Sequence, residues 1–157
     1  MVFKCTIVRD RYGSLETRPV GIYCLSYCKQ VTDAGLEHLK GVNTISLQGC
    51  QFTDAGLKHL VGVHTIDLSD RTQVTNAGLE HLKGVHTIDL SDCTQVTNAG
   101  LEHLKGVHTI NLYGCQQVTD AGLKHLKGVH TICLYGCPRI TMDYIIILRQ
   151  SGVIVKN

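Results

Sequence analysis

The chain has 157 residues, 43% of them hydrophobic, and its formal net charge is +2 at pH 7 with the histidines counted neutral. This balance is too mildly basic for a nucleic-acid-binding domain, and no apolar run approaches the length of a transmembrane helix. The first residues also lack the long apolar stretch of a signal peptide, so we expect an intracellular protein.

Six near-copies of one unit fill most of the chain. The leucines that close successive units recur at intervals of 22, 21, 22, 22 and 22 residues. They are Leu25, Leu47, Leu68, Leu90, Leu112 and Leu134. This period predicts a solenoid in which every unit is a short strand followed by a short helix. We expect a single domain over 1–157, with an N-terminal cap and first strand in 1–24, tandem repeats of about 22 residues in 25–134, and a C-terminal repeat and cap in 135–157.

The N-terminal end precedes the regular repeats. Phe3, Ile7 and Val8 are available for an extra strand or hairpin that covers the open end of the core. Tyr23 and Leu25 already keep the spacing of the later units. We therefore expect the first parallel strand to lie near these two residues.

The strand of one unit is clearest around Leu90. Ile88 and Leu90 are two residues apart, so both point to the same face of a strand, toward the core. Asp89 lies between them and points outward. Cys93 follows three residues after Leu90, where the chain turns off the strand. A thiol is small, tolerates burial and is a weak donor, so it suits this turn.

The helix of the same unit begins after Thr97, a residue type that caps helices well. Leu101 and Leu104 are three residues apart and give the helix a buried stripe, and Gly106 terminates it. In three repeats an aspartate follows the capping threonine, where its charge suits the helix dipole: Asp33, Asp54 and Asp120. A helix of about two turns is too short to be stable alone, so stacking must hold it.

The motif C-x-x-V-T-D-A-G-L-x-x-L closely resembles the cysteine-containing subclass of leucine-rich repeats, and it recurs in register over roughly residues 20–148. That subclass is known from F-box substrate receptors of ubiquitin ligases and from related proteins of bacteria and giant DNA viruses. The resemblance implies an α/β fold, a right-handed leucine-rich-repeat solenoid bent into an arc or horseshoe. A parallel sheet lines the concave side and short helices line the convex side. The resemblance also implies a role in protein recognition.

Several features depart from that subclass. Only 24 residues precede Leu25, fewer than an F-box needs, so an adaptor role in a ligase is not carried over. Arg71 stands where the repeated cysteine is expected, and an unpaired guanidinium is costly to bury, so we expect it to swing outward. The second repeat lacks one residue after Cys50, and we expect Phe52 to fill the space.

Five of the eight cysteines occupy the same place in successive repeats. This structural cysteine ladder consists of Cys28, Cys50, Cys93, Cys115 and Cys137. The repeat period explains the ladder without disulfides, so we expect buried, reduced thiols. Reduced thiols predict a cytoplasmic protein, in the host cytosol if the chain is viral or an effector.

Nine histidines form two rows along the repeats. One row lies on the helices (His38, His59, His81, His103 and His125) and the other beside the strands (His64, His86, His108 and His130). Neighbouring histidines on strands about 4.8 Å apart could share a metal, but copying of one residue with its repeat explains the rows more simply. Catalysis needs one special residue at one place, which repetition does not provide. We predict no metal, no cofactor and no enzymatic activity.

The outward strand positions carry the variation between repeats. An acidic middle is followed by an aromatic edge, a pattern typical of a binding face. The predicted partner-binding residues are Thr65, Asp67, Asp70, Thr87, Asp89, Asp92, Asn111, Tyr113, Cys133 and Tyr135. The alternative is a solvated face whose charges serve solubility.

The C-terminal unit differs from the others. Residues 145–148 read Ile-Ile-Ile-Leu, which is apolar on every side of a helix, and Val153, Ile154 and Val155 favour a closing strand. We expect this strand to cover the apolar helix, which gives a monomer. An end-to-end homodimer through the same surface is the alternative, because large exposed apolar patches usually mark interfaces.

These patterns predict a non-catalytic protein–protein interaction module. Its concave face is expected to bind another protein through a basic segment, with no nucleic acid and no membrane involved. Two alternatives stay open. One is the substrate-recognition component of a ubiquitin-ligase-type assembly whose adaptor lies on another chain. The other is a structural, self-associating repeat protein.

Overall fold

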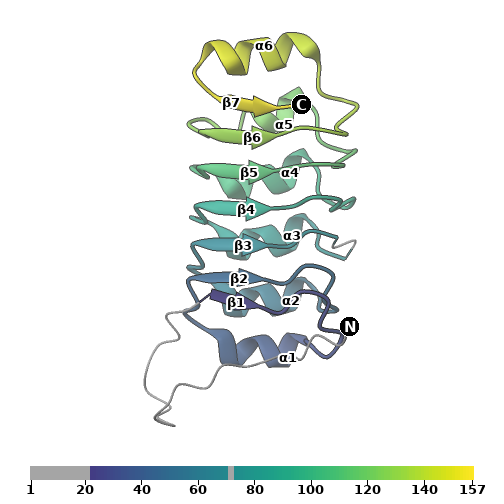
Figure 1. Cartoon of the computed structure of the whole chain (residues 1–157), viewed down its shortest axis with the longest axis vertical. Helices are drawn as coiled ribbons and strands as arrows, with labels where there is room; N and C mark the ends of the chain where they lie inside the picture. Colours follow the sequence, from purple (N-terminus) through teal and green to yellow (C-terminus); the bar gives the residue numbers. More distant parts are fainter. Residues whose placement is uncertain (1–21, 71–72) are drawn as a thin grey trace.

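The computed structural model describes residues 22–70 and 73–157, which form a column of stacked repeats (Figure 1). Each repeat contributes one strand of three residues. The strands are β1 (Ile22–Cys24), β2 (Thr44–Ser46), β3 (Thr65–Asp67), β4 (Thr87–Asp89), β5 (Thr109–Asn111), β6 (Thr131–Cys133) and β7 (Ile154–Lys156). The predicted first strand is confirmed, one residue earlier than expected. Arg71 and the proposed N-terminal strand residues Phe3, Ile7 and Val8 lie outside the described residues.

The described strands form one parallel sheet in the order of the chain, from β1 to β7. The register passes from strand to strand without an offset, so that Ser46 lies beside Asp67 and Asp67 beside Asp89. The missing residue of the second repeat therefore leaves the strands in register. Phe52, in the turn where the residue is missing, is 3% exposed, which confirms that its side chain fills this part of the core.

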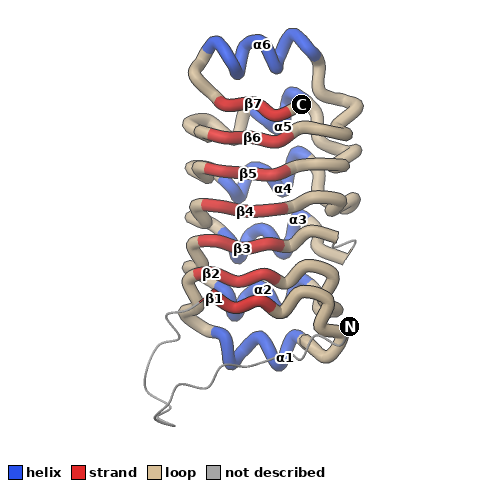
Figure 2. Tube along the Cα trace, in the orientation of Figure 1, coloured by secondary structure: helices blue, strands red, loops and turns tan. Residues whose placement is uncertain are grey.

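The helices all lie on one side of the sheet along the first five repeats (Figure 2). They are α1 (Asp33–Leu36), α2 (Asp54–Leu57), α3 (Asn76–Leu79), α4 (Asn98–Leu101), α5 (Asp120–Leu123) and α6 (Met142–Gln150). The first four continue into 3-10 turns, namely η1 (Glu37–Leu39), η2 (Lys58–Leu60), η3 (Glu80–Leu82) and η4 (Glu102–Leu104). Apart from α6, each α-helix is a single turn, so packing between repeats must hold it in place. No helix in the described part of the chain is both long and apolar enough to span a membrane.

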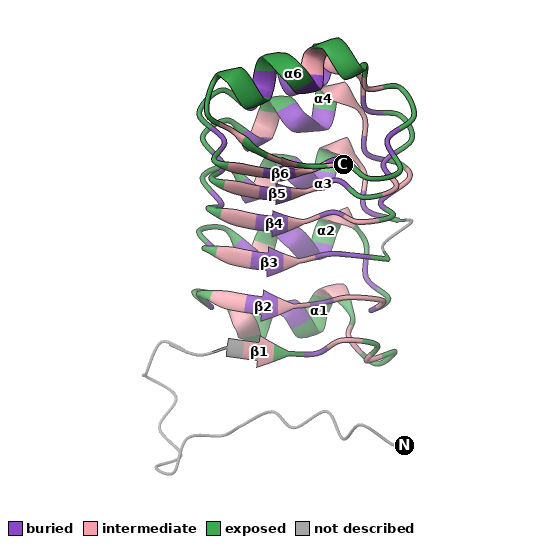
Figure 3. Cartoon of the chain, turned by 45° about the horizontal axis from the view of Figure 1, so that its top comes forward, coloured by how far each residue is buried: buried purple, intermediate pink, exposed green. Residues whose placement is uncertain are grey.

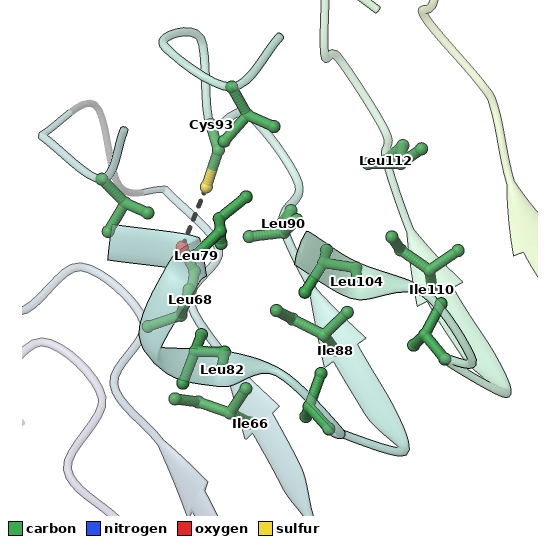
Figure 4. Packing of buried hydrophobic residues seen from close by; sticks show 14 of the residues in the cluster. Ile66, Leu68, Leu79, Leu82, Ile88, Leu90, Cys93, Leu104, Ile110 and Leu112 are labelled. Atoms are coloured by element: carbon green, nitrogen blue, oxygen red, sulfur yellow. Dashed lines mark hydrogen bonds between the residues drawn. The ribbon is translucent and has the colours of Figure 1, made fainter. Parts of the chain in front are cut away.

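The core is a continuous column of aliphatic side chains between sheet and helices (Figure 4). The buried residues recur on the strands and helices along the column (Figure 3). In one layer, Ile88 lies on β4 and Leu90 directly follows it, while Leu101 ends α4 and Leu104 ends the 3-10 turn η4. None of the four is more than 1% exposed. Each repeat thus buries its apolar residues against its neighbours, as the period predicts. These features establish the leucine-rich-repeat solenoid expected from the sequence.

The cysteine ladder forms hydrogen bonds between the turns that follow the strands. The Cys93 thiol donates a hydrogen bond to the Leu68 carbonyl of the preceding repeat at 3.2 Å (Figure 4). The corresponding pairs are Cys50 with Leu25, Cys115 with Leu90 and Cys137 with Leu112, at 2.9 to 3.2 Å. At Leu25, Leu90 and Leu112 the backbone N–H of the cysteine three residues further on donates to the same carbonyl, so two donors satisfy each of these three. Cys28 is different: it is half-buried and disulfide-bonded, so the expected buried, reduced thiol is wrong there.

A second ladder joins the helices. The Asp54 carboxylate accepts hydrogen bonds from the backbone N–H of Thr75, at 3.0 Å, and from the Thr75 hydroxyl. The Thr75 oxygen in turn accepts from the Ala77 N–H and caps α3. The other pairs are Asp33 with Thr53, Asn76 with Thr97, Asn98 with Thr119 and Asp120 with Thr141. The first-turn residues therefore bind the following repeat, in addition to any effect on their own helix.

Asp54 and Leu57 of the preceding repeat lie so close to Gly78 that no side chain fits there. A Cβ added there would lie 2.8 Å from Leu57 Cδ1 and even closer to the Asp54 carboxylate. Gly35, in the first repeat, is exposed, and its nearest such neighbour is Thr32 Oγ1 at 3.5 Å. The repeated glycine is thus required by the preceding repeat, and not by its own helix.

Candidate functional site

The outward surface of the sheet, here called the sheet face, is built of rows that run along the column. Residues two apart on a strand share a face, so each strand contributes two outward side chains. One row contains Thr44, Thr65, Thr87, Thr109 and Thr131, and the next contains Ser46, Asp67, Asp89, Asn111 and Cys133. All ten side chains are half-buried. The predicted residues Thr65, Thr87, Asn111 and Cys133 therefore lie on this face, between the more exposed rows at its two edges.

At the edge where the strands begin, His64, His86, His108 and His130 form a continuous stack of exposed rings. Their ring centroids are 4.5, 4.6 and 4.8 Å apart, and the planes are tilted by 11 to 24°. Reduced hydration, followed by the neighbouring imidazoles, lowers the pKa of His86 below its usual value. Stacked rings direct their nitrogens side by side instead of toward a common point. In the described ranges, no three histidine, cysteine or acidic side chains are placed to share a metal ion.

The two aspartates at the centre of the sheet face are engaged by neighbouring groups. Asp67 accepts hydrogen bonds from the Ser69 backbone N–H at 2.9 Å, the Ser69 hydroxyl at 2.7 Å and the Ser46 hydroxyl at 2.8 Å. Asp89 accepts the matching pair from Ser91, and the Asn111 side chain donates at 2.9 Å. These carboxylates therefore fix the turns after β3 and β4, and a ligand finds their lone pairs largely occupied.

The other two predicted aspartates occupy a turn with a special backbone conformation. Asp70 has φ 60° and Asp92 has φ 58°. The equivalent positions of other repeats also have positive φ, and they are held by Tyr27, with φ 58°, and by Gly49, Gly114 and Gly136. Aspartate tolerates this left-handed conformation better than most residues, so turn chemistry is one reason for the two acidic side chains.

Asp70 and Asp92 differ in their surroundings. Asp70 accepts a hydrogen bond from the Gln48 amide of the preceding repeat at 2.9 Å. It also accepts one from the Tyr27 hydroxyl at 3.1 Å, a contact that spans two repeats. The bond to Asp70 raises the pKa of Tyr27. Asp92 is exposed on the next turn, and Tyr113 follows it one repeat later. The sequence does not predict the bond between Tyr27 and Asp70, because no local pattern indicates a contact across an intervening repeat.

The predicted aromatic edge is present. Tyr113 and Tyr135 are 48% and 52% exposed, and both directly follow the buried leucine that closes their strand. They are one repeat apart, with Asp92 on the turn before them. Tyr135 also borders a shallow cavity lined by Leu134, Pro138, Ile140, Met142 and Ile145 among other residues. The structure therefore brings three of the predicted binding residues together near the C-terminal end of the sheet face.

One thiol on the sheet face has an altered acidity. Cys24 is exposed, and its sulfur lies 3.4 Å from the Ser26 hydroxyl. Hydrogen bonds from the Ser26 side chain and backbone lower the pKa of Cys24. The interior turns behave in the opposite way, because burial raises the pKa of Cys137 to about 11. Thiolate formation is therefore easier at Cys24 on the sheet face than at the buried ladder thiol of Cys137.

The chain is similar to known proteins in its fold only. No family model matches the chain, and no curated protein matches it. Among solved structures, the chain is similar to one in the Rad7–Elc1 complex from yeast, with a TM-score of 0.50 and 13% identity over 80% of this chain. A second likeness is to a chain of the Toll–Spatzle complex from Drosophila, with a TM-score of 0.46 and 14% identity over 68% of this chain. The matched parts are 44% and 18% of those chains, so this protein spans less than half the length of either.

Proposed function

We propose that this protein is a non-catalytic interaction module that binds another protein through the C-terminal half of its sheet face. The observation that carries the proposal is the pair of half-exposed tyrosines, Tyr113 and Tyr135, held on adjacent turns beside Asp92. Tyrosine offers a large, rigid and amphipathic contact area, and it is enriched among the residues that dominate binding energy. The two side chains project from a rigid sheet, so little order has to be gained on binding.

Charge favours a basic segment as the ligand. Asp92 is exposed, and Asp70 keeps its carboxylate at the same edge. Asp67 and Asp89 are occupied by hydrogen bonds, but their charges add to the field over this part of the face. We therefore assign direct contacts to Asp92 and the tyrosines, and a longer-range attraction to the two central aspartates. Attraction of this kind weakens as salt is added.

We infer further that the chain belongs to the cysteine-containing subclass of leucine-rich repeats. The support is the set of ladder thiols that donate to leucine carbonyls, a structural role for the residue that defines the motif. Oxidation would abolish that role, which favours a reducing, cytoplasmic location. The disulfide at Cys28 argues against a reducing location. The intact mass of the chain, purified from reducing cytosol under acid quench, decides between the two.

A role within a ubiquitin-ligase-type assembly remains the narrower form of the proposal. The similar yeast chain was solved as a complex of Rad7 with Elc1. A recognition module whose further components lie on other chains accords with that likeness in fold. Co-purification with or without a second, adaptor-like chain separates this form from a module that acts alone.

The test compares two variants of the full chain as bait. Affinity capture with the wild type identifies a partner, and its affinity is then measured against Tyr113→Ala/Tyr135→Ala. We expect a loss of at least about tenfold, or roughly 1.4 kcal/mol, with unchanged thermal stability. The matched control is Lys105→Ala, on the helix side, which should bind as the wild type does. Equal binding by the tyrosine variant would place the interface elsewhere.

A further inference from the structure

The helix α6 has two apolar sides, and the repeat stack covers only one. Ile145 and Leu148 face inward and are 6% and 9% exposed. Met142, Ile146 and Ile147 face outward and are 59%, 45% and 55% exposed. The closing strand β7 pairs with β6 and leaves the outer side of α6 exposed, so the expected cover of the whole apolar helix by this strand is wrong.

The outer side of α6 is unlike the outer side of the other helices. In the corresponding turn of the fourth repeat the exposed residues are Glu102 and Lys105, which form an ion pair at 3.5 Å. α6 lies at the end of the column, beyond the last strand, where no further repeat follows in the described structure (Figures 1 and 3). Exposed apolar side chains gathered on one terminal surface usually mark an interface.

The charges on α6 identify the occupant. Asp143 lies three residues before Ile146, and Arg149 lies three residues after it, and both are exposed. Three residues advance a helix by about 4.5 Å, so the opposite charges lie at equal distances on either side of Ile146. Arg149 is held in place by hydrogen bonds to the Val155 carbonyl, at 3.4 Å, and to the Asn157 side chain.

We propose that a second copy of this chain packs on α6 through a two-fold, antiparallel helix pairing centred on Ile146. In this arrangement Ile146 meets its own counterpart, and Asp143 of each copy faces Arg149 of the other. A two-fold interface presents the same patch on both copies, so the one helix supplies both the apolar contact and two ion pairs. The inference does not rest on the proposed function, because the observations that carry it are on α6 and not on the sheet face.

Sedimentation equilibrium of the full chain in reducing buffer tests the interface. The wild type should have twice the mass of one chain, and Ile146→Glu should have the mass of one chain with an unchanged circular dichroism spectrum. The control is Val61→Glu, an equally apolar and 62% exposed residue at the end of η2, which should leave the dimer intact. A wild-type monomer, or a dimer that survives Ile146→Glu, overturns the proposal.

A charge exchange tests the antiparallel geometry. Asp143→Arg alone gives two copies that repel at both ends of the helix pair, and Arg149→Asp alone does the same with the opposite sign. Each variant should dissociate at least about tenfold more readily than the wild type. An equimolar mixture of the two should form a heterodimer, because every facing pair is then complementary. If the mixture stays monomeric while the wild type is dimeric, the two copies do not meet in the proposed way.

Discussion

The surfaces between repeats and the sheet face follow different rules. Between repeats the same residue types return at most levels, because each one contacts the preceding repeat. The capping threonine and the helix glycine meet its first-turn aspartate or asparagine, and the ladder cysteine binds a leucine carbonyl. On the sheet face, one row changes from Ser46 to Asp67, Asn111 and Cys133 along the column. The contrast teaches that a contact with the adjacent repeat fixes a residue type. The stacked histidines of the sheet face return in the same way, whereas this central row varies.

The largest expected difference between the two regions is in thiol reactivity. The thiolate is the reactive form of cysteine. The pKa of Cys137 is raised to about 11 and that of Cys24 is lowered. At neutral pH, Cys24 should therefore be alkylated more than about a hundred times faster than Cys137. Peptide mass spectrometry after brief iodoacetamide treatment measures the ratio. Denatured protein, in which both thiols react alike, is the control, and equal rates in the native protein would contradict the contrast.

A methyl group added between repeats should be costly. Gly78→Ala places a Cβ 2.8 Å from Leu57 Cδ1 and against the Asp54 carboxylate. Overpacking of this kind costs roughly 2–3 kcal/mol in the free energy of unfolding. The shift in the midpoint of urea unfolding measures it.

The matched control for that substitution is Gly35→Ala. Gly35 is exposed, and among the described residues the nearest group is Thr32 Oγ1, at 3.5 Å, so the added methyl makes only an ordinary van der Waals contact there. Because alanine is the better helix former, this variant should be more stable by about 0.5–1 kcal/mol. If Gly78→Ala and Gly35→Ala both raised the free energy of unfolding, the contact of Gly78 with the preceding repeat would be unimportant for stability.

A pair of isosteric substitutions compares the two regions directly. Thr75→Val removes the cap of α3 and a partner of the half-buried Asp54 carboxylate, so it should cost about 1–2 kcal/mol of unfolding free energy. Thr87→Val makes the same change on the sheet face, where the hydroxyl contacts only the adjacent His86 ring among the described groups. Its effect should stay within about 0.5 kcal/mol of zero. Thermal unfolding of both variants tests the difference.

The smallest expected effect is a pH dependence at the histidine stack. The pKa of His86 is lowered, so the folded state favours the neutral ring. The contribution of His86 to the free energy of unfolding is therefore fully present above the pKa of the ring in the unfolded chain, about 6.5. It is lost as the pH falls through the pKa of His86 in the folded protein. His64→Asn/His108→Asn should raise the pKa of His86 only in part, because reduced hydration is the larger cause. Titration of the ring protons by NMR measures it, and no change would exclude coupling along the stack.

The sequence predicts the fold in detail because one short pattern repeats. Alternation of Ile88 and Leu90 places the strand, Thr97 starts the helix, and the period aligns each unit with the next. The closing strand is also predicted to within one residue. These features depend on local spacing, which the sequence displays directly.

The state of the site residues is less predictable. Asp67 and Asp89 look available for binding, but serines two residues further on bind their carboxylates. The bond between Tyr27 and Asp70 crosses an intervening repeat, so no local pattern indicates it. The burial of one side of α6 and the exposure of the other likewise depend on where β7 lies in space. Each of these features results from side-chain geometry between units and not from spacing within one unit.

The unbroken register of the strands has a mechanical consequence. Each strand pairs with the next at the same three positions, even across the repeat of 21 residues. A force that separates the two ends of the column therefore loads near-identical contacts in series. The column should yield one repeat at a time, starting at a terminal one, and each step should release a similar length of chain. The number of repeats then determines how far the protein extends, while the contacts of a single repeat determine the force at which it begins to do so.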